Sequence, residues 1–220
     1  NNPNFSLCLH LCLTEGLPIS NPRIIPKLIN KKGILSISFG ILLLYSFLPK
    51  NNIYRRKLEK QLRHEVKEQI IIFKKLTGHK KISIDGHQHI HLIPIVLDII
   101  LDLSTEYEIT WIRTTKEEFE GKLFWDNWKS ILLSTRILKW IVLQILSSFS
   151  KKSLRKFKIS TNNSFSGILF TGQMSEEVIS NYMKKLSKLN YILTNTRPIL
   201  LIHPSEVLNE SEVELSLLNF

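Results

Sequence analysis

The sequence contains no alanine and only two cysteines in 220 residues. Cys8 and Cys12 lie four positions apart in one apolar segment. On a strand they face the same side, at a separation too large for a disulfide. The cysteines therefore predict no disulfide framework, and they favour a reducing, cytoplasmic location.

Uninterrupted apolar runs of membrane-spanning length are also absent. Ile34–Leu48 is shorter than the roughly 20 residues that a spanning helix needs, and charged and amide side chains interrupt Ile131–Phe149. The first residues lack the basic region of a secretory leader. We therefore expect no membrane span. Because residue 1 is Asn rather than Met, we also expect the chain to be part of a longer product.

Acidic residues are too few to balance the basic ones, and the net charge of +11 suggests a nucleic-acid partner. The lysines are scattered, however, and no basic stripe is interleaved with aromatic residues as in single-strand binders. The missing alanine accompanies an abundance of Ile, Leu, Lys, Asn and Ser, a skew that indicates AT-rich coding. We therefore expect no nucleic-acid partner.

Segments with helical and with strand periodicity alternate along the chain. Leu58, Leu62 and Val66 recur at the spacing of an amphipathic helix, which Gly78 ends. This alternation predicts an α/β fold with a largely parallel sheet in a single domain, with residues 34–50 left ambiguous. Helices are expected at Ile53–Thr77, Pro94–Ser104, 126–150 and Ser175–Leu189, strands at Phe5–Thr14, Ile82–Asp85, Tyr107–Arg113, Phe165–Phe170 and Ile199–His203, and a partly helical acidic tail at 205–220.

Three of the seven histidines fall at positions 87, 89 and 91, directly behind Asp85. Neutral imidazole is the commonest metal ligand in proteins, and a neighbouring carboxylate can fix its tautomer. If the strand continues, these four side chains project to one side about 6.6 Å apart, so that a cation binds one or two of them. If a helix begins instead, His87 and His91 form an i, i+4 pair that can share an ion. Both backbones permit a metal or catalytic site, and the alternative is a solvated polar turn.

Histidines also occur in two other expected strands, at His10 and His203. In β/α barrels the chemistry collects where the strands end, so we expect His10, His87 and His203 to face one cavity. His64 lies in a charged helix and His79 in a basic turn, and both are expected to be structural.

Several blocks resemble the YdjC-like carbohydrate deacetylases, the family that contains the chitooligosaccharide deacetylases. The segment from Ile84 to His91, followed by Pro94, is the most specific of these blocks. The others follow in the family order, and the resemblance spans nearly the whole chain. They are residues 9–33, the helix with Glu65 and Gln69, Ile112-Arg113, Phe165 with Gly167, and His203-Pro204.

The resemblance implies a distorted (β/α) barrel of the glycoside hydrolase/deacetylase type. It also implies removal of an acetyl group from an N-acetylated amino sugar or oligosaccharide, with one divalent cation, Mg²⁺ or Zn²⁺. His10 and His87 are the implied metal ligands, together with an aspartate nearer the N-terminus, and His203 is the implied proton donor. Asp85 is expected to assist catalysis by orienting a ligand. Arg113, His89 and His91 are expected to bind the sugar.

The family also carries an Asn-Ala-Asp-Asp-Phe-Gly block before the histidine that matches His10, and this sequence holds no Asp-Asp pair. We therefore expect residues 1–220 to form one YdjC-like domain that is incomplete at its N-terminus and lacks the first β-α unit. Such a chain is expected to hydrolyse slowly or not at all. The alternative is a catalytically inactive remnant that binds a carbohydrate or a partner protein.

Overall fold

The structure, a computed structural model, describes residues 7–117, 136–168, 179–180, 183–184, 198–200, 206–208 and 211–213. Its contacts divide the chain into two compact units, residues 1–113 with 150–160 and residues 114–149 with 161–220. Parallel strands alternate with helices in the first unit, which confirms the expected α/β class.

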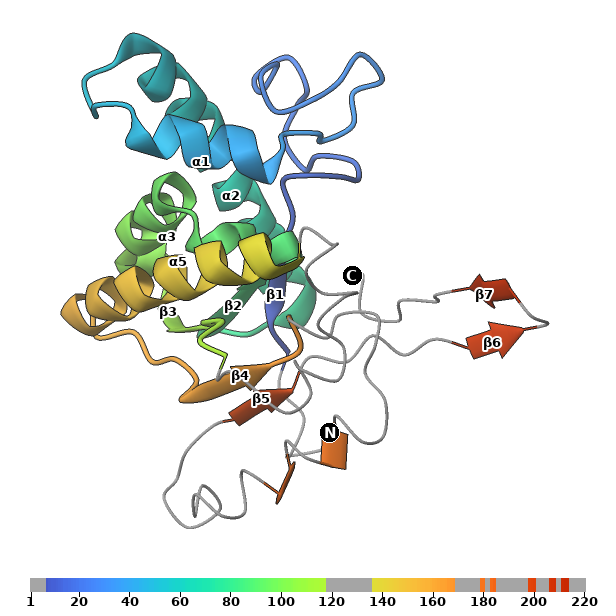
Figure 1. The fold of residues 1–220 in the computed structure, drawn as a ribbon. Coiled ribbons are helices and arrows are strands. Elements are labelled where there is room, and N and C mark those ends of the chain that lie inside the picture. The colour runs from blue at the N-terminus through green and yellow to red at the C-terminus, as the bar shows by residue number, and fades with distance from the viewer. Residues whose placement is uncertain are drawn as a thin grey trace. The chain divides into compact units, whose positions relative to one another are not determined.

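The first unit is built on a parallel sheet with the strand order β1-β2-β3 (Figure 1). These strands are β1 (Leu9–Leu11), β2 (Ile82–Gly86) and β3 (Ile109–Ile112), all shorter than or close to the expected ranges. On β1 and β2 the leucine and isoleucine side chains are buried, and alternation turns His10 and Asp85 to the opposite face. The sheet therefore separates the hydrophobic core from a polar face that carries both side chains.

The longest helix of this unit, α2 (Ile53–Thr77), has the predicted bounds. The side chain of Asn52 caps its first turn by accepting from the backbone N–H groups of Tyr54 and Arg55. Gly78 ends it with a left-handed φ of 71°. Its apolar stripe is buried, as the spacing predicts, and comprises Leu58, Leu62, Val66 and Ile70.

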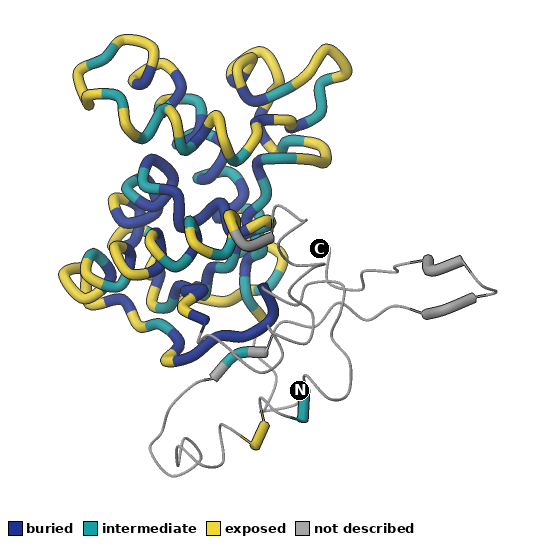
Figure 2. The backbone as a smooth tube through the Cα atoms, viewed as in Figure 1, coloured by how far each residue is buried: buried dark blue, intermediate teal, exposed yellow. Residues whose placement is uncertain are grey.

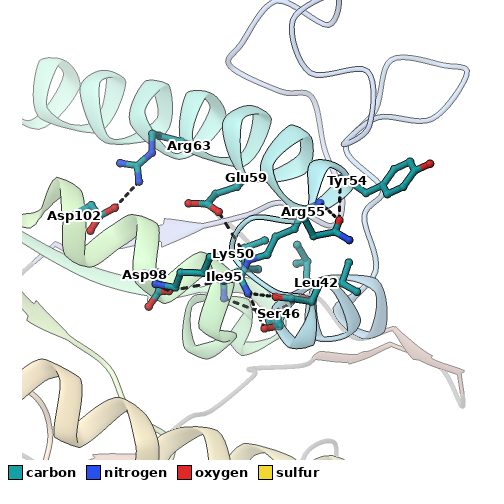
Figure 3. Close-up of polar contacts among 12 residues, drawn as sticks. Leu42, Ser46, Lys50, Tyr54, Arg55, Glu59, Arg63, Ile95, Asp98 and Asp102 are labelled. Carbon is teal, nitrogen blue, oxygen red and sulfur yellow. Dashed lines mark hydrogen bonds and ion pairs between the residues drawn. The ribbon is translucent and has the colours of Figure 1, made fainter.

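A short helix, α1 (Phe39–Phe47), forms within the stretch that the sequence left ambiguous. Buried Arg55 closes its C-terminal end, because Nη1 donates to the carbonyl oxygens of Ser46 and Leu48 at 3.0 and 2.5 Å (Figure 3). Nη2 of Arg55 lies 4.0 Å from a carboxylate oxygen of Asp98 in the third helix. One guanidinium thereby ties three helices together at a helix C-terminus, where a cation is favoured.

The third helix, α3 (Pro94–Tyr107), lacks a side-chain cap of its own because its N-cap residue is Ile93. Instead, the hydroxyl of Ser46 accepts a hydrogen bond from the backbone N–H of Ile95 at 3.1 Å (Figure 3). A capping bond that is normally local is here made by a residue far away in sequence.

Nearly all apolar residues of α3 are buried, in contrast to the striped pattern of α2 (Figure 2). The reason is that α3 packs against α2, α1 and β3, whereas α2 contacts β1 and α3 and leaves one side to solvent. The core of the first unit therefore lies between these helices and the sheet.

The second unit contains a parallel pair, β4 (Ser164–Ser166) with β5 (Pro198–Leu200). It also contains an antiparallel pair, β6 (Glu206–Leu208) with β7 (Ser211–Val213). The described residues of the tail 205–220, which is expected to be partly helical, are these two strands. Each of the two strands contains a β-branched valine, which favours extended backbone.

Helix α5 (Arg136–Lys156) runs six residues further than the expected range 126–150, whose first ten residues lie outside the described part of the chain. The basic stretch after residue 150 is therefore mostly helical. Among the described residues, no helix combines the length and the apolar character that crossing a bilayer requires.

The two glycines at positions 78 and 40 test whether backbone conformation alone ends α2. A Cβ at either position meets nothing within 4 Å, but only Gly78 has a positive φ. We expect Gly78→Ala to lower the free energy of unfolding by about 1 kcal/mol. Gly40→Ala, inside α1, is expected to be neutral or stabilising by up to about 1 kcal/mol. Urea denaturation followed by circular dichroism measures both, and equal stabilities for the two variants would contradict the assignment.

Candidate functional site

The polar face of the sheet brings His10 and Asp85 together. The register of the parallel strands pairs these two residues directly, and Nδ1–H of His10 donates to Oδ2 of Asp85 at 3.3 Å. Because they stand on neighbouring strands in register, no flexible loop intervenes between imidazole and carboxylate.

His87 follows directly after β2 and faces the ring of His10. The ring centroids lie 5.6 Å apart, with an angle of 78° between the ring planes. Nε2 of His87 lies 3.2 Å from Oε1 of Glu15, an exposed residue of the loop after β1. Sequence analysis did not single out Glu15, since a loop residue has no periodicity that reveals its partner.

The three clustered histidines point in different directions, so both expected backbones are wrong. Residues His87–Leu92 form a short 3₁₀ segment in which Gln88 and His89 have left-handed φ values of 50° and 64°. These two residues break both the alternation of a strand and the i, i+4 spacing of an α-helix. Only His87 of the cluster therefore lies beside His10, whereas His89 and His91 are buried.

Arg113, directly after β3, forms hydrogen bonds with both buried histidines. Its Nη2 donates to Nδ1 of His89 at 3.0 Å, and its carbonyl oxygen accepts from Nε2 of His91 at 2.8 Å. The His91 ring packs on Gly86 so closely that a Cβ at position 86 would collide with it. The glycine between Asp85 and His87 is thus required by this close approach.

The same guanidinium holds Asp85, with Nη2 at 2.5 Å from Oδ1. Burial by itself raises the pKa of Asp85. The hydrogen bond from His10 and the charge of Arg113 outweigh this effect and hold the pKa well below its usual range. Asp85 is therefore an ionised carboxylate that accepts from His10.

Burial also sets the state of Cys8, which precedes β1. It raises the pKa of this thiol to about 12, and the negative charge of Asp85 adds to the effect. Cys8 is therefore a neutral thiol and a poor nucleophile.

Two polar residues of α2 hold the loop that carries Glu15. The side-chain amide of Gln69 accepts from the backbone N–H of Cys12 at 3.1 Å and donates to its carbonyl oxygen at 2.6 Å. Glu65 is fully buried and accepts from the N–H groups of Ile19 and Ser20 at 3.1 and 2.9 Å. Both residues fall on the apolar stripe of α2, and a carboxylate and an amide at such positions are the signal that reveals a buried polar role.

The sequence matches the family model of the YdjC-like proteins over residues 1–218. The chain belongs to the YdjC-like family. The resemblance identified from the motif blocks is thereby confirmed.

Three relatives of this YdjC-like chain are named carbohydrate deacetylase. The protein of Danio rerio is 31% identical over 109 residues, which cover 50% of this chain and 33% of that protein. The protein of Brevibacillus brevis is 30% identical over 121 residues, covering 53% and 43%. The protein of Xenopus laevis is 26% identical over 172 residues, covering 71% and 54%. The YdjC-like chain thus spans about half or less of the length of these relatives.

The described residues fit part of a metal site. Nε2 of His10 is buried and has no hydrogen-bond partner among them. His87 lies beside it, but no described group of three or more His, Cys, Asp or Glu side chains is arranged to hold an ion. His203, the expected proton donor, lies outside the described residues. The structure therefore brings together the two expected histidine ligands, and the part of the chain that it describes holds no third ligand beside them in a group that could bind an ion.

The buried ring of His91 predicts a pH dependence of stability. Burial lowers its pKa from 6.5 to about 4, although the charge of Asp85 opposes this effect. Between these values the unfolded chain binds a proton that the folded chain does not, so stability falls as the pH falls. We expect His91 to contribute a loss of about 3 kcal/mol between pH 6.5 and pH 4.

The measurement is urea denaturation at several pH values of the wild type and of His91→Gln, in which this slope is missing. His79→Gln removes an exposed histidine and is expected to give a curve parallel to that of the wild type. If the stability of the wild type and that of His91→Gln fall in parallel as the pH is lowered, the pKa of His91 is not lowered on folding and the prediction is wrong.

Proposed function

We propose that this chain acts as a carbohydrate deacetylase, a metal-dependent hydrolase that removes an acetyl group from an N-acetylated amino sugar or oligosaccharide. Membership of the YdjC-like family and the names of its relatives support this proposal. The observation that carries it is the approach of the His10 and His87 rings to 5.6 Å on adjacent parallel strands, with His10 in β1 and His87 directly after β2.

His10 and His87 are the residues that would hold one divalent cation, either Mg²⁺ or Zn²⁺. Imidazole nitrogens favour zinc, whereas oxygen ligands suit either ion. The buried, unpartnered Nε2 of His10 supports its assignment as a ligand within the described residues. When bound, such a cation polarises the acyl carbonyl and lowers the pKa of water.

The other residues of the site orient the ligands or handle protons. Asp85 accepts a hydrogen bond from Nδ1–H of His10, so that Nε2 of that ring carries the lone pair that can bind a metal ion. Glu15 adds a carboxylate beside His87. His203 is the proposed donor of a proton to the leaving amine. Sugar binding by Arg113, His89 and His91 stays a prediction.

We further propose that the chain forms one YdjC-like domain with the architecture of a distorted (β/α) barrel. Support comes from the family match over residues 1–218. The order β1-β2-β3 also supports it, because each new parallel strand is added beside the previous one, as in a barrel.

A second candidate function is binding of a carbohydrate or a partner without hydrolysis. One observation favours it: the residues that the structure describes offer no group of three metal ligands. Two imidazoles bind a cation more weakly than the three protein ligands of a catalytic zinc site.

The first test is metal uptake. We expect the wild-type chain to bind zinc, and His10→Ala and His87→Ala to reduce the affinity by at least tenfold, because each removes one of two imidazole ligands. His64→Ala, on α2, is the matched control and is expected to bind zinc like the wild type. Isothermal titration calorimetry on the metal-free chain measures all four proteins. Equal affinities in His87→Ala and His64→Ala would rule out the assigned ligands.

The second test is release of acetate from N,N′-diacetylchitobiose in the presence of Zn²⁺ or Mg²⁺. We expect the wild type and the His64→Ala variant to release acetate, and the His87→Ala variant to release none. Metal uptake by the wild type without any acetate release would favour the binding function over hydrolysis.

A further inference from the structure

We propose that Arg113 is a positioning residue: it holds the carboxylate of Asp85 in the orientation that fixes the tautomer of His10. This inference rests on the proposed function in one respect only, the use of Nε2 of His10 as a metal ligand. The effect on His10 itself does not depend on the bound cation.

The two oxygens of Asp85 have separate partners. Oδ1 accepts from Nη2 of Arg113 at 2.5 Å and from the backbone N–H of Gly86 at the same distance. Oδ2 faces Nδ1 of His10 at 3.3 Å. Since Oδ1 is held from two directions, the plane of the carboxylate is set, and Oδ2 can only point at the His10 ring.

Arg113 is itself fixed on several sides. Its backbone N–H donates to the carbonyl oxygen of Ile84 on β2 at 3.0 Å, and its own carbonyl accepts from His91. Its Nη2 also contacts Nδ1 of His89 at 3.0 Å. The backbone of Arg113 and its Nη2 atom are therefore both held by neighbouring segments, as in a preorganised donor.

The consequence for His10 follows from donor and acceptor chemistry. An ionised carboxylate only accepts hydrogen bonds, so of the two tautomers of the His10 ring it favours the one with the proton on Nδ1 and a lone pair on Nε2. Such carboxylate–histidine pairs orient ligand rings and raise their basicity, and losing the partner commonly costs 10- to 100-fold in metal affinity. Arg113 acts one step further out, through Asp85.

Burial distinguishes this role from sugar binding. The side chain of Arg113 is only 6% exposed, whereas that of His10 is 24% exposed. Both side chains contact Asp85, but the imidazole of His10 is accessible to solvent and the guanidinium of Arg113 is almost completely buried. His89 and His91 are also buried, and both contact Arg113.

The test compares Arg113→Gln and Arg113→Lys with the wild type, using the full chain labelled with ¹⁵N-histidine. Long-range ¹H–¹⁵N NMR of the metal-free protein reads the tautomer of His10, whose signals are assigned by their absence in His10→Ala. Zinc titration reads the affinity. The matched control is Arg63→Gln, which breaks the exposed pair of Arg63 with Asp102 on α2 and α3.

We expect the wild type and Arg63→Gln to show His10 protonated on Nδ1. Arg113→Gln is expected to show a mixture of the two tautomers and zinc binding 10- to 100-fold weaker. Arg113→Lys retains the charge without the fixed plane, and a smaller change, with three- to tenfold weaker zinc binding, is expected.

A folded Arg113→Gln with the wild-type tautomer and zinc affinity within twofold of the wild type overturns the proposal. If circular dichroism shows that Arg113→Gln does not fold, Arg113→Lys decides, and wild-type behaviour in both measurements overturns the proposal. A wild type that binds no zinc contradicts the proposed function, and the tautomer of His10 in the metal-free variants still decides the role of Arg113.

Discussion

The site depends on one ionised carboxylate between two strands. Asp85 accepts from His10 across the β1–β2 register and from Arg113 at the end of β3. A buried carboxylate is costly unless it is paired and hydrogen-bonded, and here three adjacent parallel strands provide its partners. The same contacts that make burial of this charge tolerable also set the direction of the His10 ring. Stability and ligand geometry therefore have a common origin at this position.

Helix α2 has a comparable double role. Leucine, valine and isoleucine on its stripe bury against the sheet and α3, and Glu65 and Gln69 on the same side bond the backbone of the loop after β1. Buried polar groups are stabilising only when their partners are complete, and the free backbone groups of this loop complete them. The loop carries Glu15 to the His87 ring, so the packing of the helix contributes to the position of this carboxylate.

Membership of the YdjC-like family agrees with the arrangement of the first unit. The most specific motif, from Ile84 to His91, contains a strand end, a required glycine and a left-handed turn, each with its own physical reason. Asp85 needs the register with His10, Gly86 leaves space for the His91 ring, and the turn sends His87 alone to the polar face. The motif therefore determines the local backbone conformation as well as the identity of the candidate ligands.

The sequence by itself determined several of the regular elements, because periodicity and end signals are local. It predicted α2 from Ile53 to its glycine stop, the strand that ends at Asp85 and the helix that begins at Pro94. Tertiary structure alone decided that His89 and His91 are buried and do not follow the direction of His87, since left-handed Gln88 and His89 follow no periodic pattern. It also decided the partners of Glu15 and Arg113, which are joined to the site by contacts between segments far apart in the chain. Side-chain direction in an irregular segment depends on what packs around it, and no local pattern of residues contains that information.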